Sequence, residues 1–304
     1  MSPVCPLIVL KEDDPMSQLP RVVQTRADAR SVIQAARDVG KRVGFVPTMG
    51  ALHQGHVRLI ETARHECGLV VVSIFVNPTQ FGPGEDFAKY PRDLERDRQA
   101  CAAGHADLIF APSVAEMYPR GEGATVIVPP SSLSGRLEGA IRPGHFQGVA
   151  TVVAKLFGIC APDLAYFGEK DYQQLLVIRR LVADLDFGVA IRAVPTVREP
   201  DGLAMSSRNR YLDAAERQAA TVLSRALEQA KRAVGGGERS ADRVRQVLRE
   251  TVESERSARI DYVEVADPET LEPLTVVPAA GAARALLAVR IGATRLIDNA
   301  SLSE

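Results

Sequence analysis

Two histidines, His53 and His56, lie in the ten-residue segment PTMGALHQGH at residues 47–56, separated from each other by one glutamine and one glycine. At this spacing both imidazoles can reach one anion at the start of a helix. The first turn of a helix has unpaired backbone N–H groups and a partial positive charge, which together favour a phosphate. The pattern therefore predicts a phosphate site.

The sequence on either side of this segment supports that interpretation. A short apolar run typical of a buried strand precedes it, residues 43–46, and a helical pattern follows it, residues 57–67. Ligands of open α/β sheets bind beyond the carboxyl ends of strands. Gly50 and Gly55 allow the backbone to approach a base or a phosphate closely. Two alternatives stay open: the histidines cap the helix, or they bind a metal, although no third ligand is evident nearby.

Further polar residues follow later strand-like runs. Lys170 and Arg208 lie on loops predicted at the same sheet edge, where two cations would neutralise a triphosphate. The hydroxyls of Ser206–Ser207 are hydrogen-bond donors for phosphate oxygens, although serines in this position equally fit a helix cap. Gln80 and Gln174 carry amides that both donate and accept hydrogen bonds, which suits a hydroxy-acid substrate. Taken singly, each of these residues also fits an ordinary surface or cap position.

Strand-like and helical patterns alternate along the first two-thirds of the chain. Apolar and β-branched runs predict further strands at residues 69–76, 107–111, 164–167 and 189–194. A capping box at Thr25 and Asp28 predicts a helix that ends at Gly40, and helical spacing predicts helices at residues 93–103, 148–159 and 172–184. Such alternation predicts an α/β fold whose parallel sheet is covered by helices on both faces.

The pattern changes after about residue 200. Asp213 and Glu216 form a predicted capping box that opens a long helix, and the three glycines at residues 235–237 end it. A second helix begins near Ser240. Three strand-like runs separated by Pro and Gly follow, at residues 260–266, 285–291 and 294–298. We predict a smaller C-terminal α+β unit, with the boundary at residues 196–208.

Composition narrows the class of protein. The 304 residues are 46% hydrophobic and 25% charged, so a sizeable core is expected, and the net charge of -1 argues against a nucleic-acid surface. No apolar run approaches the roughly 20 residues of a membrane helix. The cysteines at positions 5, 67, 101 and 160 lie far apart, which predicts reduced thiols in a cytoplasmic protein. Residues 1–20 lack the features of a secretory signal and are expected to be a disordered leader.

The turn at residues 53–56 resembles the HxGH signature of the nucleotidylyltransferase superfamily and of class I aminoacyl-tRNA synthetases, which act on the α-phosphorus of ATP. Further segments narrow the resemblance: FVNPTQF at residues 75–81, RPGHF at 142–146, FGEKDYQQ at 167–174, and TVRE with DGLAMSSRN at 196–209. In this order and at these separations, from about residue 21 to residue 304, the segments resemble the pantothenate synthetase family.

The resemblance implies a role for each matching residue. ATP would bind Met49, Gly50, Ala51, Leu52, His53, Gln54, Gly55, His56, Gly168, Glu169, Lys170, Asp171, Val197, Met205, Ser206, Ser207 and Arg208. His56 would be the proton donor, and His53, Lys170 and Arg208 would also act in catalysis. Gln80 and Gln174 would hold pantoate, whose methyl groups we expect Phe81 and Val149 to shelter. The implied fold is a Rossmann-like, doubly wound domain at residues 21–196 with a smaller lid at 197–304, usually in a homodimer.

The implied reaction joins pantoate to β-alanine. The pantoate carboxylate attacks the α-phosphorus of ATP, pyrophosphate leaves, and the β-alanine amine then expels AMP from pantoyl-adenylate to give pantothenate. Mg²⁺ would accompany ATP; its ligands are unknown, and Asp97 is the candidate to test. Three other classes stay open: a nucleotidylyltransferase with a second cationic pocket, a tRNA-charging enzyme, which would need a basic face, and a non-catalytic nucleotide sensor.

Overall fold

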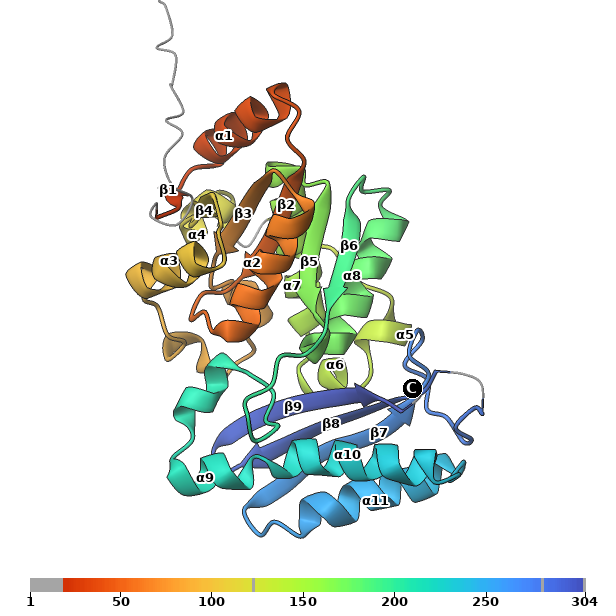
Figure 1. Cartoon of the computed structure of the whole chain (residues 1–304). Helices are drawn as coiled ribbons and strands as arrows, with labels where there is room; N and C mark the ends of the chain where they lie inside the picture. The colour runs from red at the N-terminus through yellow and green to blue at the C-terminus, as the bar shows by residue number, and fades with distance from the viewer. Residues whose placement is uncertain (1–18, 122–123, 280–281, 303–304) are drawn as a thin grey trace, which may run out of the picture.

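A computed structural model of the chain describes residues 19–121, 124–279 and 282–302 (Figure 1). Of the expected leader at residues 1–20, all but Leu19 and Pro20 lies outside the described residues. A six-stranded parallel sheet forms the first part of the structure. Its spatial order is β1 (Arg21–Val23), β4 (Leu108–Phe110), β3 (Leu69–Ile74), β2 (Val43–Thr48), β5 (Leu164–Gly168) and β6 (Ala190–Val194).

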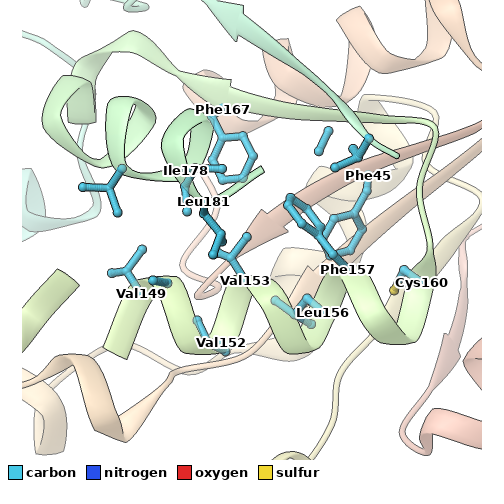
Figure 2. Close-up of a cluster of buried hydrophobic side chains, with 14 of the residues drawn as sticks. Phe45, Val149, Val152, Val153, Leu156, Phe157, Cys160, Phe167, Ile178 and Leu181 are labelled. Carbon is cyan, nitrogen blue, oxygen red and sulfur yellow. The ribbon is translucent and has the colours of Figure 1, made fainter. Parts of the chain in front are cut away.

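Helices cover both faces of this sheet. Successive residues of a strand point to opposite faces, so each face has apolar side chains that a helix layer buries. On one face Phe45 packs with α1 (Arg26–Asp38), α7 (His145–Cys160) and α8 (Tyr172–Asp184). On the other face Val46 packs with α2 (Gln54–Glu66) and α3 (Leu94–Ala103). Figure 2 shows α7 directing Val153 and Phe157 toward Phe45, and the Phe45 and Phe157 rings meet edge to face at 6.4 Å. The central strands are therefore buried on both sides.

Short elements connect these layers. They are η1 (Pro78–Gln80), η2 (Asp86–Ala88), α4 (Val114–Met117), α5 (Ser131–Ser134), α6 (Glu138–Ile141), η4 (Glu169–Asp171) and η5 (Ser207–Tyr211). Four of them, η1, η2, η4 and η5, lie in the loops that follow β3, β5 and β6. Three of them carry polar residues that the sequence singled out: Gln80 in η1, Glu169, Lys170 and Asp171 in η4, and Ser207 and Arg208 in η5.

The C-terminal part of the chain forms a second layer pair. An antiparallel sheet of β7 (Ala258–Ala266), β8 (Arg284–Ile291) and β9 (Thr294–Ser301) packs on α10 (Val222–Gly235) and α11 (Ala241–Glu253). Figure 1 shows this sheet below the parallel sheet, with α10 and α11 on its far side and the short α9 (Ala214–Ala219) beside it. The face of this sheet that α10 and α11 leave uncovered is turned toward the parallel sheet (Figure 1).

The predicted fold class is confirmed: a doubly wound parallel sheet precedes a smaller α+β unit. The Thr25 hydroxyl caps α1 by accepting the N–H of Asp28 at 3.1 Å, as predicted. The prediction of one long helix after Asp213 is wrong. The capping box forms, but it opens only the six-residue α9, and the chain turns before α10 begins at Val222. The strand β1 was not predicted, because three residues at a sheet edge leave too short a pattern.

The helices give no sign of a membrane span. Within the ranges that the structure describes, none of them combines the length and the hydrophobicity needed to cross a bilayer.

Candidate active site

A cavity of about 240 Å³ lies at the carboxyl ends of the parallel strands. Its walls come from the segments that follow β2, β3, β5 and β6, together with residues 205–208. A larger cavity of about 860 Å³ adjoins it and reaches β9 of the C-terminal sheet. The two share seven lining residues: Arg142, His145, Lys170, Asp171, Gln174, Ser206 and Arg208. Together they form one cleft between the two sheets.

The two histidines of the HxGH turn cap α2 and line the smaller cavity. Nδ1 of His53 accepts the N–H of Gly55 at 3.1 Å, and Nδ1 of His56 accepts the N–H of His53 at 3.3 Å. The ring centroids are 4.1 Å apart. Since each Nδ1 is an acceptor, each neutral ring carries its proton on Nε2. The pair is thus a helix cap and also a source of two Nε2–H donors.

Both imidazoles favour the neutral form. Burial, with the nearby His56 and Lys170, lowers the pKa of His53 to about 2. Burial also lowers the pKa of His56 to about 4, helped by Lys170 and opposed by Asp171. The histidines therefore act near pH 7 as hydrogen-bond donors and not as cations. Among the described residues, no group of three or more His, Cys, Asp or Glu side chains is placed to hold a metal ion.

The backbone from Gly50 to Leu52 is fixed by hydrogen bonds to the Asp97 side chain. Gly50 has a φ of +83°, and Ala51 follows with +52°. The Asp97 carboxylate accepts the N–H of Ala51 at 2.9 Å and that of Leu52 at 2.7 Å, and its residue is only 2% exposed. A Cβ on Gly50 would lie 2.8 Å from the same carboxylate, so glycine fits this position.

This arrangement bears on the magnesium role considered for Asp97. Both oxygens already bind loop N–H groups, and burial raises the pKa of Asp97 against the effect of those hydrogen bonds. Mg²⁺ usually keeps several waters and binds through one or two carboxylates, whereas this carboxylate is buried and occupied by the loop N–H groups. The structure favours a role in shaping the 50–52 loop.

Gln80 lies in the cavity wall with its amide oriented by a buried asparagine. Asn77, 1% exposed, donates to Oε1 of Gln80 at 3.1 Å and accepts the hydroxyl proton of Tyr118 at 2.9 Å. Nε2 of Gln80 lies 3.0 Å from the Met49 sulfur, a weak acceptor that a substrate oxygen can replace. Gln174 lines the same cavity from α8. Two amides thus face a common space.

An apolar wall faces these amides. Phe75, Phe81, Val149 and Val152 line the cavity beside Gln80. The two residues expected to shelter methyl groups, Phe81 and Val149, are among them. The cavity therefore combines hydrogen-bonding and apolar surfaces, as a branched hydroxy acid requires.

The RPGHF segment, residues 142–146, holds the backbone of Gln80 through a hydrogen bond. Arg142 binds both oxygens of Glu85, at 2.7 and 2.6 Å, and also contacts Nε2 of His145 at 3.1 Å. Burial and the neighbouring Arg142 lower the pKa of His145 to about 4. The neutral ring accepts from Arg142 at Nε2 and donates from Nδ1 to the backbone carbonyl of Gln80 at 2.9 Å. Sequence reasoning used this motif only for the resemblance and missed its supporting role.

Two cations reach the cleft from opposite loops. Lys170 extends from η4 and lines both cavities. Arg208 forms an ion pair with Asp86 of η2: its Nε donates to Oδ2 and its Nη2 donates to Oδ1, both at 3.1 Å. Although burial acts in the opposite direction, this pair keeps the pKa of Asp86 below its usual value. An anion bound at Arg208 would compete with Asp86. The sequence did not predict that Asp86 belongs to the site.

Most residues singled out from the sequence meet in this cleft. The lining includes Met49, His53, Gly55, His56, Gln80, Gly168, Lys170, Asp171, Gln174, Val197, Met205, Ser206, Ser207 and Arg208. Five expected ATP contacts are not in the lining: Gly50, Ala51, Leu52, Gln54 and Glu169. The first three lie in the loop held by Asp97, and Glu169 forms an ion pair with Arg284 of the C-terminal sheet at 3.5 Å.

A doubly wound sheet with two donor histidines on a strand-to-helix turn and two cations on facing loops defines a nucleotide-binding α/β enzyme. Comparison with known proteins specifies it further. Residues 21–301 match the family model described as pantoate-beta-alanine ligase. The chain therefore belongs to the pantoate–β-alanine ligase family.

Individual relatives agree with this assignment. The chain is 53% identical over 283 residues to the pantothenate synthetase of Pelotomaculum thermopropionicum, covering 93% of this chain and 99% of that protein. A crystal structure of pantothenate synthetase from Thermus thermophilus superposes with a TM-score of 0.88 at 50% identity, covering 93% and 100%. The Francisella tularensis ligase, solved with "Beta-gamma ATP and Beta-alanine", gives a TM-score of 0.78 at 35% identity, covering 94% and 98%.

Proposed function

We propose that this chain joins pantoate to β-alanine, consuming ATP and releasing AMP and pyrophosphate through a pantoyl-adenylate intermediate. One observation carries the proposal: the Nε2–H donors of His53 and His56 share a cavity with the amides of Gln80 and Gln174. The histidines suit a phosphate, and the amides suit a hydroxy acid. Family membership supports the same reaction.

In the first step the pantoate carboxylate attacks the α-phosphorus of ATP. Two anions must meet, and the charge on the departing pyrophosphate grows. Fixed donors and cations in a dehydrated cleft stabilise that charge at little reorganisation cost. We assign this task to His53, His56, Lys170 and Arg208, and the proton-donor role of His56 is that of a neutral ring whose Nε2–H donates a hydrogen bond to a phosphate oxygen. Gln80 and Gln174 would hold pantoate.

In the second step the β-alanine amine attacks the acyl-adenylate and expels AMP. Water must be kept from the mixed anhydride, which argues for a cover over the cleft. We propose residues 21–196 as the ATP- and pantoate-binding domain and residues 197–304 as the lid. The larger cavity between the parallel sheet and β9 is where β-alanine would enter.

The nucleotide contacts are proposed on the matching segments. The lining residues Met49, Gly55, Gly168, Asp171, Val197, Met205, Ser206 and Ser207 would surround ATP together with the four catalytic candidates. For Gly50, Ala51, Leu52, Gln54 and Glu169 the ATP contact stays a prediction. The Asp97 anchor supports the loop that would pass beneath the nucleotide.

Mg²⁺ is proposed to accompany ATP and to reduce the negative charge of its phosphates. Its ligands would be mainly phosphate oxygens and water, as is common for this ion. One observation supports this: both oxygens of the Asp97 carboxylate already accept backbone N–H groups.

We also propose a cytoplasmic homodimer. The cysteines within the described ranges, Cys67, Cys101 and Cys160, are free thiols, as in a reducing compartment. Val126 and Val128 are 51% and 71% exposed in the segment before α5, whereas Ile127 between them packs on the core. Exposed valines alternating with a buried residue suit contact with a second copy. Light scattering of the wild type and of Val128→Asp tests this: the variant should dissociate.

The reaction is tested by incubating the protein with Mg-ATP, pantoate and β-alanine and identifying the products by mass spectrometry. We expect pantothenate, AMP and pyrophosphate in equal amounts. Without β-alanine, pyrophosphate should appear once per site with pantoyl-adenylate. Release of ADP and phosphate would instead identify an acyl-phosphate ligase. A product that stops at an adenylated substrate would favour a nucleotidylyltransferase.

A further inference from the structure

A buried asparagine of the C-terminal sheet binds the loop that carries Lys170. Nδ2 of Asn299, on β9, donates to the backbone carbonyl of Glu169 at 2.9 Å and to that of Lys170 at 2.8 Å. These are consecutive carbonyls of η4, the turn between β5 and α8. A residue 129 positions away therefore fixes the backbone from which the Lys170 side chain extends.

The orientation of this amide is itself fixed. Oδ1 of Asn299 accepts from the Arg284 guanidinium at 2.6 Å, and Asn299 is only 5% exposed. Turning the amide over would place Oδ1 against two carbonyl oxygens and the NH₂ group against a guanidinium. Arg284 also stacks on the ring of Tyr172 at 3.5 Å and pairs with the Glu169 carboxylate at 3.5 Å. All these contacts converge on the same turn.

The preceding residue of β9 holds a second loop of the cleft. Asp298, whose side chain is 1% exposed, binds the Arg198 guanidinium at 2.6 and 3.0 Å. Arg198 follows Val197 and donates to the carbonyl of Gly202 at 3.0 Å. Two adjacent side chains of β9 thus hold the loops that follow β5 and β6. The relative position of those loops depends on the C-terminal sheet.

We propose that Asn299 is a positioning residue for Lys170, which sets the place of its ammonium group in the nucleotide site. The inference rests on the proposed function, because Lys170 is taken as an ATP contact. Among the residues that the structure describes, Lys170 forms an ion pair with Asp171 at 3.7 Å, which is too long to fix a flexible side chain. The bonds from Asn299 to its backbone supply the constraint. The C-terminal sheet then contributes to the chemistry of the first step and is more than a cover.

The test uses two substitutions of Asn299. Asn299→Ala removes both donors, and Asn299→Asp keeps the shape but places a carboxylate against two carbonyl oxygens. A catalytic group displaced by about 1 Å can cost on the order of 100-fold in rate. We expect both variants to lose about 10- to 100-fold in kcat/KM for ATP, measured by pyrophosphate release. The KM for pantoate should change less than about twofold, because Asn299 does not line the cavity that holds Gln80.

A matched control separates positioning from folding. Arg245 of α11 also donates to two backbone carbonyls, those of Val265 at 3.2 Å and Leu274 at 2.5 Å, away from the cleft. Arg245→Met should lower the melting temperature without changing kcat/KM for ATP. If Asn299→Ala lowers the melting temperature equally and leaves kcat/KM for ATP unchanged, the role of Asn299 is structural and the proposal is overturned.

A double-mutant cycle asks whether Asn299 acts through Lys170. Residues that act together show non-additive effects. In a Lys170→Ala background, Asn299→Ala should therefore cost less than about threefold. A full additional loss would overturn the proposal. If Lys170→Ala alone keeps wild-type kcat/KM for ATP, the assignment of Lys170 to the nucleotide fails, and the inference fails with it for that separate reason.

Discussion

Nδ1 of His56 accepts the backbone N–H of His53, so the proposed proton donor is also part of the cap of α2. A capping box of this kind usually pairs a hydroxyl or carboxylate residue with a Glu or Gln. Two imidazoles can replace them because a neutral ring has one acceptor and one donor nitrogen. Capping uses Nδ1 and leaves Nε2–H for a phosphate. The short motif thus satisfies the helix and prepares the site with the same side chains.

His56→Ala is expected to affect chemistry strongly and stability modestly. Loss of one preorganised donor usually costs about 10²- to 10³-fold in rate, so single-turnover pyrophosphate release should fall by that factor. Loss of a capping partner costs about 0.5–2 kcal/mol, which urea unfolding at neutral pH will measure. A variant with near-wild-type pyrophosphate release would show that His56 serves the helix alone.

Acid should destabilise the protein through its buried histidines. The folded-state pKa values of His56 and His145, each about 4, lie below the unfolded value of 6.5. Between these values the unfolded chain binds protons that the folded chain does not, so stability is retained above pH 6.5 and lost as the pH falls toward 4. Each histidine contributes a slope of about 1.4 kcal/mol per pH unit.

The slope is measured by urea unfolding at a series of pH values from neutral down to about pH 5. His145→Asn removes one of these groups, so its stability should decrease less steeply than that of the wild type. A variant as steep as the wild type would mean that burial does not suppress protonation of this ring. Activity need not follow the same profile, because the substrates titrate as well.

Lys170 and Gln174 should divide the two substrates between them. Lys170 is a cation on η4, and Gln174 is an amide near the start of α8 on the wall shared with Gln80. Lys170→Ala should lower kcat/KM for ATP by about tenfold or more. The KM for pantoate should stay within about twofold of the wild-type value. Gln174→Ala should do the reverse. Saturation curves for each substrate decide this, and identical profiles for the two variants would contradict the site map.

The sequence predicted the local features of this site and missed the distant ones. The HxGH turn, the strands other than β1, and the helix at residues 172–184 were recognised because each depends on a short stretch with its own period or cap. The bonds from Asn299 to η4 and from His145 to the Gln80 carbonyl join segments far apart in sequence. No spacing rule connects such residues, so only the fold reveals them.

Asp97 illustrates a different limit. Its residue type was noticed, and a carboxylate near an ATP site suggests magnesium. The structure instead shows two loop N–H groups that need acceptors, in a backbone turn with positive φ at Gly50 and Ala51. The demand for an acceptor arises from the conformation of the loop, which the sequence does not specify. The same carboxylate therefore supports different predictions before and after the loop is seen.

The last prediction concerns the specificity of the cavity. Pantoate has two hydroxyls and a dimethyl-substituted carbon close to its carboxylate. The amide of Gln80 is oriented by Asn77, so its NH₂ group is fixed in the cavity wall, and Gln174 faces the same space. Phe81 and Val149 form part of the apolar wall. We therefore expect the two kinds of substrate group to be recognised with unequal strength.

Removing one methyl group from pantoate should cost about 1–3 kcal/mol in kcat/KM, the range for a methylene in an apolar pocket. Removing a hydroxyl should cost more, because a buried amide then loses its partner and keeps its desolvation penalty. The ratios of kcat/KM for pantoate and its deoxy and desmethyl analogues measure both effects. Gln80→Ala is the internal control: it should reduce the preference for pantoate over the deoxy analogue and leave the preference over the desmethyl analogue nearly unchanged. If the wild type adenylates the deoxy analogue as well as pantoate, the amides do not read the hydroxyls, and the cavity selects by shape.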